Sequence, residues 1–103
     1  LTLDIAYDRI PLFRDAESLI KAGYKTGASG RNWTSYGNEV VLPPDFPDWK
    51  TSLLTDPQTS GGLLISCSPA RALALCGQIE AAGYPRVRIV GSASAGPAQV
   101  RIS

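Results

Sequence analysis

The residues Asp56–Gly62 combine side-chain types that could hold an anion. The run reads DPQTSGG, so a turn-forming proline, an amide, two hydroxyls and paired glycines stand directly before an apolar stretch. In such a turn, backbone N–H groups beside Gly61 and Gly62 and the hydroxyls of Thr59 and Ser60 can point at one anion. The alternative is a tight turn in which the glycines, having no side chain, let a neighbouring element pack directly on the backbone. The residue types by themselves favour this packing role.

The direction of this motif argues against a nucleotide-binding P-loop. In a P-loop the glycines follow a strand and open a helix, whose N-terminus favours phosphate. Here the glycines lead into the apolar run that starts at Leu63, and the sequence contains no Gly-Lys-Ser or Gly-Lys-Thr. We therefore expect no Walker-type site.

Arg31 and Asn32 form a second candidate for ligand binding. A guanidinium can pair with phosphate through two parallel hydrogen bonds, and this one lies in a stretch without regular periodicity. The alternative is that Arg31 braces its own loop. Both interpretations stay open from the residues alone.

The acidic residues do not form a catalytic or metal-binding group. Magnesium-assisted phosphoryl transfer needs clustered carboxylates and cations. Asp4 and Asp8 fall on the wet face of a predicted strand, Asp45 and Asp48 lie among prolines, and the chain has no histidine. We expect no catalytic residue and no metal ligand in this chain.

Composition predicts one globular domain over residues 1–103. Ten basic and nine acidic residues give a net charge of +1, which leaves no concentrated field for nucleic acid or anionic lipid. No apolar run approaches the roughly 20 residues of a membrane span, and no signal peptide is evident, so we expect a soluble, cytoplasmic protein. Because the chain has no methionine, we expect a piece of a longer protein.

Local patterns predict most of the elements. Period-2 alternation predicts a strand over 1–7, and Asp15 and Gly23 mark the ends of a short amphipathic helix. The run 62–65 is apolar on both faces and predicts a central strand. Alternation within 86–102 predicts a hairpin of two antiparallel strands.

A second helix is predicted after Ser68 as N-cap, with Pro69 at its first position and Gly83 after its end. Its apolar stripe consists of Ala72, Leu75, Cys76, Ile79 and Ala82. We expect Cys76 and the other cysteine, Cys67, to be buried and reduced.

Residues 26–50 lose periodicity and collect glycines and prolines, which predicts a long loop. Its aromatic residues would anchor it to the body of the domain: Trp33, Tyr36, Phe46 and Trp49. The order of strands and helices predicts an α+β domain in which helices layer on a mixed, mostly antiparallel sheet with partial ferredoxin-like topology.

Two motifs carry a resemblance to a known family. DPQTSGGLL at 56–64 is similar to a signature of selenophosphate synthetases (selenide, water dikinases), and residues 31–37 match their RNxxSYG pattern. The resemblance implies the C-terminal domain of an enzyme, related to aminoimidazole ribonucleotide synthetase, that makes selenophosphate, AMP and phosphate from selenide, ATP and water.

That resemblance also implies magnesium, a homodimer, and a missing N-terminal domain that holds the reactive Cys or selenocysteine and the metal ligands. The chain alone would be inactive and would bind no cofactor. The residues it implies at the nucleotide are Thr59, Ser60, Gly61, Gly62, Arg31 and Asn32.

Two other functions remain open. The chain could be the equivalent domain of a related ATP-using enzyme, such as aminoimidazole ribonucleotide synthetase, which shares the fold and a Gly-Gly-Leu element. It could also be a stand-alone binding module. The DPQTS segment before the glycines favours the selenophosphate synthetases over the related ATP-using enzymes.

Overall fold

The computed structural model describes residues 1–59 and 61–103. Its strands are β1 (Thr2–Ile5), β2 (Val40–Val41), β3 (Gly91–Ser94) and β4 (Gln99–Ile102). Its α-helices are α1 (Ala16–Lys21), α2 (Gly27–Tyr36), α3 (Asp48–Leu54) and α4 (Pro69–Ala81), and its 3₁₀ helices are η1 (Tyr7–Arg9) and η2 (Gly37–Glu39).

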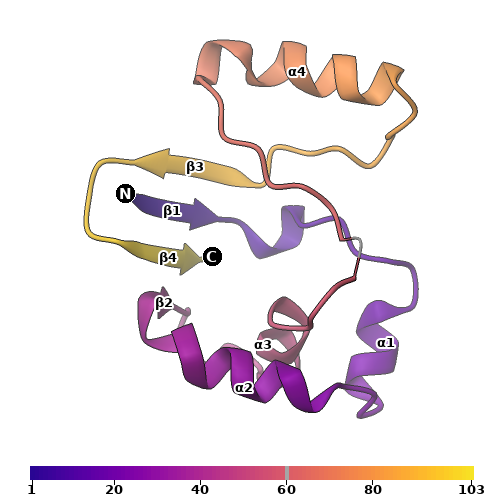
Figure 1. Ribbon diagram of the computed structural model, residues 1–103, viewed down its shortest axis with the longest axis vertical. Coiled ribbons are helices and arrows are strands. Elements are labelled where there is room, and N and C mark those ends of the chain that lie inside the picture. The colour runs from indigo at the N-terminus through magenta and orange to yellow at the C-terminus, as the bar shows by residue number, and fades with distance from the viewer. Residues whose placement is uncertain (60) are drawn as a thin grey trace.

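The described strands form a four-stranded mixed sheet in the order β2-β4-β1-β3 (Figure 1). β1 pairs antiparallel with β3 and parallel with β4, and β2 pairs parallel with β4. The predicted α+β class is confirmed. The expected predominance of antiparallel pairing is wrong for the described residues, because β1 separates the two C-terminal strands.

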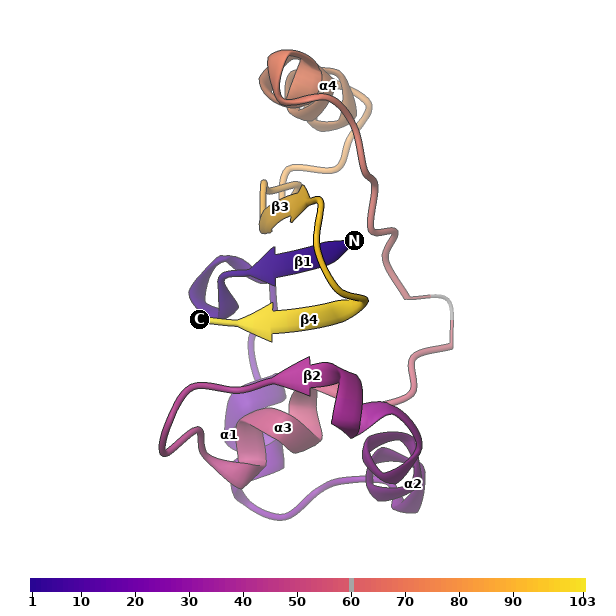
Figure 2. The same cartoon turned by 90° about the vertical axis from the view of Figure 1, so that its left-hand side faces the viewer.

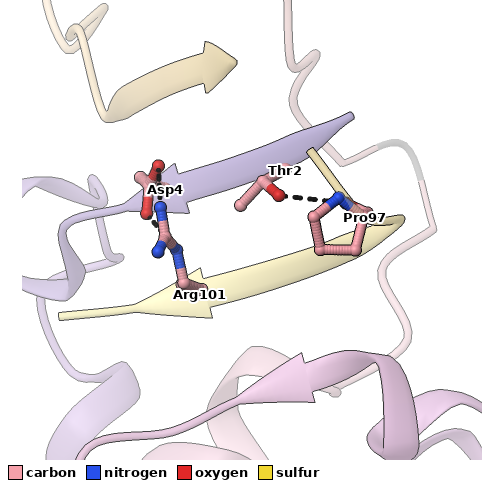
Figure 3. A network of polar contacts seen from close by, with 4 residues as sticks. All are labelled: Thr2, Asp4, Pro97 and Arg101. Carbon is pink, nitrogen blue, oxygen red and sulfur yellow. Dashed lines mark hydrogen bonds and ion pairs between the residues drawn. The ribbon is translucent and has the colours of Figure 1, made fainter. Parts of the chain in front are cut away.

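The predicted hairpin at 86–102 is therefore replaced by a split arrangement. β3 and β4 run in opposite directions, but each pairs with β1 rather than with the other. The connection between them crosses the start of β1, where Thr2 Oγ1 donates to the carbonyl of Pro97 at 2.9 Å (Figure 3). At Gly96 a Cβ would lie 2.6 Å from that hydroxyl oxygen, so any side chain here would displace the Thr2 hydroxyl from its bond to Pro97.

Arg101 and Asp4 join the parallel strands β4 and β1 on one face of the sheet. Arg101 Nε and Nη2 donate to the two carboxylate oxygens of Asp4 at 2.7 and 2.9 Å (Figure 3). This bidentate hydrogen bond raises the pKa of Arg101. Side chains of opposite charge at partnered positions favour this register.

Tyr7 connects the sheet to the helices. It follows β1, is buried, and meets the rings of Phe46 and Trp49 edge to face at centroid distances of 5.7 and 6.5 Å. The ammonium of Lys50 lies 4.0 Å from the Tyr7 ring centroid. With Ile20 and Ile102, Tyr7 makes up the buried apolar core of the described residues.

The prediction of a long loop over 26–50 is wrong, because this stretch contains α2, η2, β2 and the start of α3. Gly27 and Gly30 lower the intrinsic helix propensity of α2 by about 1 kcal/mol each. Packing overrides that cost, since Ser29 is 2% exposed and its Oγ donates to the carbonyl of Ser52 in α3 at 3.0 Å.

The two predicted helices are confirmed. Asp15 and Ser68 stand at their N-cap positions, but neither side chain makes a capping hydrogen bond. α1 and α4 are followed by Gly23 and Gly83, whose φ values of 92° and 100° only glycine adopts readily. The strand predicted over 1–7 is shorter, since the chain turns into η1 at Tyr7.

The central strand predicted at 62–65 is absent from the sheet in the described chain. Leu63 and Leu64 are 88% and 71% exposed. Helix α4 lies beyond the β3 edge of the sheet, and helices α1, α2 and α3 lie beyond the β2 edge (Figures 1 and 2). Of the predicted stripe on α4, all but Ala82 is half-buried. Cys76 is thus half-buried and Cys67 is exposed, so the expected burial of both cysteines is wrong.

Candidate functional site

The C-terminal end of α3 presents the candidate anion-binding turn. The last carbonyls of a helix have no partner within the helix and must be satisfied by other groups. Thr55, which is 5% exposed, donates its hydroxyl to the carbonyl of Thr51 at 2.9 Å. The carbonyl of Ser52 accepts the hydroxyl of Ser29. The first bond holds the residue before the turn to α3, and the second holds α2 to α3.

Asn32 extends this support to the turn itself. Its Nδ2 donates to the carbonyl of Thr55 at 2.9 Å, across 23 residues of sequence. Thr55 directly precedes Asp56, so Asn32 of the first motif holds the residue that leads into the second. The amide of Asn32 thus has a structural partner, and its direct contact with a nucleotide stays a prediction.

Arg31 lies beside Asn32 on α2 but is exposed. Its guanidinium folds back along the helix, where Nη1 would lie 3.5 Å from a Cβ at Gly27. Among the side-chain hydrogen bonds that the structure describes, none joins Arg31 to the turn. A contact between Arg31 and a nucleotide therefore stays a prediction.

The turn is exposed at Thr59, Gly61 and Gly62, and Ser60 lies outside the described residues. A Cβ at Gly61 would lie 3.0 Å from Cβ of Gln58, so the chain folds back tightly at this position. A Cβ at Gly62 would meet no described atom within 4 Å. Within the described chain, Gly61 is therefore the more constrained of the pair.

A groove of about 1430 Å³ runs along the turn. Its turn side is lined by Asp56, Pro57, Gln58, Thr59, Gly61 and Gly62. The remaining walls are mostly apolar. They come from residues 10–13, α1, the last residues of α3, Leu63 and Ile65, the end of α4 and the segment that follows it.

Arg86 is a cation in the lining of this groove, and it is already engaged. Its Nη1 donates to the carbonyl of Leu12 at 3.3 Å, and its guanidinium lies 5.0 Å from the ring centroid of Phe13. The turn side thus offers hydroxyl and backbone donors, while Asp56 adds a negative charge. This chemistry suits hydrogen bonds to a ligand oxygen at the turn and apolar contacts along the rest of the groove.

The carboxylates of the described chain do not converge on a metal site. Within residues 1–59 and 61–103, no group of three His, Cys, Asp or Glu side chains could hold a metal ion. Asp4 is already engaged by Arg101 through both carboxylate oxygens.

Tyr7 is a residue whose special position the sequence did not indicate. Its hydroxyl is buried without a hydrogen-bond partner among the described atoms. Burial raises the pKa of Tyr7, with smaller contributions from the negative charges of Glu17 and Asp8. Alternation along 1–7 predicts that Tyr7 lies on the apolar face. Whether its hydroxyl is buried without a partner depends on Phe46 and Trp49, which pack against its ring from distant parts of the sequence.

No helix in the described part of the chain is both long and apolar enough to cross a membrane. Comparison with protein-family models found no match.

Curated proteins do resemble the chain over almost its full length. It is 53% identical over 102 residues to the "Selenide, water dikinase" of Rhizobium meliloti (strain 1021), covering 99% of this chain and 29% of that protein. The protein of the same name from Burkholderia orbicola (strain MC0-3) is 40% identical over 103 residues, again with 29% of its length covered. That of Dechloromonas aromatica (strain RCB) is 41% identical over 96 residues, or 93% of this chain and 28% of the relative.

Proposed function

Because the chain belongs to the selenide, water dikinase family and spans about 29% of the length of these relatives, we propose that it is the C-terminal domain of an ATP-dependent selenophosphate synthetase. The whole enzyme would convert selenide, ATP and water to selenophosphate, AMP and phosphate, and would act as a homodimer. The observation that carries this proposal is the 53% identity over 99% of the chain.

Within that enzyme, this chain contributes a positioning surface rather than the reacting groups. The Asp56–Gly62 turn is braced by Asn32 and Thr55 at one end and lines the large groove. Its exposed backbone and the hydroxyl of Thr59 are available to an oxygen of ATP. A hydrogen bond to a charged phosphate oxygen is worth about 1.5–3 kcal/mol, enough to orient the nucleotide without reacting with it.

Magnesium does not fit the described residues of this chain. Hard divalent cations need several oxygen ligands around one point, and the acidic side chains here are dispersed, with Asp4 already paired to Arg101. We assign magnesium, the reactive residue and the phosphoryl-transfer groups to the remaining part of the enzyme. The isolated chain should then be inactive.

The alternative functions have less support. The relatives named above are selenide, water dikinases, and none of these three bears the name of aminoimidazole ribonucleotide synthetase or of a stand-alone binding module. The DPQTS segment favours the same assignment.

The test is an assay of selenide-dependent AMP formation with the isolated chain and with the longer protein that contains it. We expect AMP formation from the longer protein and none from the isolated chain. AMP formation by the isolated chain would refute its assignment as a non-catalytic domain. A folded longer protein that fails to make AMP with selenide and ATP would refute the proposed activity.

A further inference from the structure

The apolar segment Gly62–Ser66, which we call the strap, is in solvent. Leu63, Leu64 and Ile65 are 88%, 71% and 52% exposed. In an extended chain, successive side chains point to opposite sides, so these three would present apolar groups on both faces. Such two-sided apolar character is typical of a strand inside a sheet that is covered on both faces.

Among the residues that the structure describes, no strand pairs with the outer edge of β3, so this edge could receive such a strand. β3 ends the sheet order, and its residues are exposed. The amide of Ala6 donates to the carbonyl of Val90 at 2.9 Å. Because hydrogen-bonded pairs alternate along antiparallel strands, Ser92 faces β1 and the amide of Ala93 points to the free edge. An edge of this kind is a template for another strand.

α4 joins the strap to β3 in a way that favours parallel addition. Neighbouring parallel strands need a crossover of about a dozen residues or more, and this is usually a helix. α4 has 13 residues and stands between the strap and β3 in sequence. The order therefore matches a β-α-β unit. The half-buried stripe of α4 would cover one face of the enlarged sheet: Ala72, Leu75, Cys76 and Ile79.

We infer that the strap adds to the free edge of β3 as a parallel strand when the rest of the longer protein covers the second face of the sheet. α4 can shield one face of the strap only, which explains why the strap stays in solvent in this chain by itself. Gly62 ends the turn and begins the strap, so addition fixes the carboxyl end of the turn against the sheet. The inference rests on the proposed function only in requiring a longer protein.

The first test is amide hydrogen exchange at Ala93. We expect exchange to be slower by about 100-fold or more in the longer protein than in the isolated chain, because pairing protects an edge amide from solvent. The measurement does not involve activity, so it can succeed or fail whatever the enzyme assay shows. Equal, rapid exchange of Ala93 in both proteins overturns the inference.

The second test identifies what pairs with the edge. Ala93→Cys is combined in turn with Leu63→Cys, Leu64→Cys and Ile65→Cys in the longer protein, and disulfides are mapped by mass spectrometry after mild oxidation. Adjacent strands place Cα atoms within disulfide range, so at least one pair should close. Leu73→Cys with Ala93→Cys is the control, because Leu73 lies on the exposed side of α4. Strap pairs that close no faster than this control overturn the inference, even if Ala93 is protected.

Discussion

The amide of Asn32 and the carbonyl of Thr55 show how one side chain can position a whole motif. Asn32 lies within a helix and reaches Thr55, the residue directly before the Asp56–Gly62 turn. Thr55 is buried, so water reaches its carbonyl poorly. Removal of the Asn32 amide would therefore leave this carbonyl without a hydrogen-bond partner.

Asn32→Ala should lower the free energy of unfolding by about 1–2 kcal/mol, because it leaves a buried carbonyl unpaired. The measurement is the urea midpoint at constant m. Asn38→Ala is the matched control, since Asn38 is exposed in η2, and it should change stability by less than about 0.5 kcal/mol. Equal effects of the two changes would contradict the bracing role of Asn32.

Tyr7→Phe should raise the free energy of unfolding by about 1 kcal/mol, since it removes a buried hydroxyl that has no partner in the described structure. Burial also raises the pKa of Tyr7, so the folded state keeps the phenol proton after the unfolded chain begins to lose it. The contribution of the Tyr7 phenol proton to stability is therefore fully present below about pH 10 and is lost as the pH rises through the folded pKa.

The measurement is urea denaturation at neutral pH and above pH 10. The part of the alkaline decline that Tyr7 causes should disappear in Tyr7→Phe. Tyr24→Phe is the control, because Tyr24 is exposed and its substitution should leave neutral-pH stability unchanged. A less stable Tyr7→Phe protein would show that the hydroxyl has a partner.

At the scale of elements, glycines at strand crossings decide the sheet topology. β1 lies between β3 and β4, so its backbone is approached from both sides. At Gly91 a Cβ would collide with the carbonyl of Asp4, whereas at Gly30 in α2 it would meet no described atom within 4 Å.

Gly91→Ala should therefore lower stability by about 2 kcal/mol or more, since β1 and β3 must move apart. Gly30→Ala should instead raise stability by about 0.5–1 kcal/mol, because alanine is the better residue in a helix. Thermal unfolding of both variants checks the pair. A neutral Gly91→Ala protein would mean that the β1–β3 pairing is looser than described.

At the scale of the whole molecule, a small core leaves much apolar surface uncovered. A domain of about 100 residues buries only about 60–70% of the surface of its unfolded chain. Leu63, Leu64 and Leu73 are large apolar residues in solvent. Exposed apolar surface of this kind is typical of interaction surfaces.

The isolated chain should bind the apolar dye ANS, and Leu63→Gln with Leu64→Gln should reduce its fluorescence at least about twofold, because surface apolar residues at a patch dominate such binding. Leu1→Gln is the control, with a similarly exposed leucine outside the patch. Far-UV circular dichroism establishes that the fold is kept. Unchanged fluorescence of the double variant would contradict the exposure of this segment.

The sequence by itself determined α1 and α4, because apolar periodicity and a terminal glycine are local signals. Gly23 and Gly83 take the left-handed conformations that end these helices. The sequence also identified the two motifs and the mixed α+β class. These features depend on residues within a few positions of one another, so a linear pattern is enough to predict them.

Tertiary structure alone decided α2, the split of the C-terminal strands and the contact between the motifs. α2 forms in a glycine-rich stretch because Ser29 is buried on α3, and β1 separates β3 from β4. Asn32 meets Thr55 across 23 residues. In each case, contacts between distant segments outweigh the local preference of the sequence. Those contacts form only when the chain folds, so a linear pattern does not reveal them.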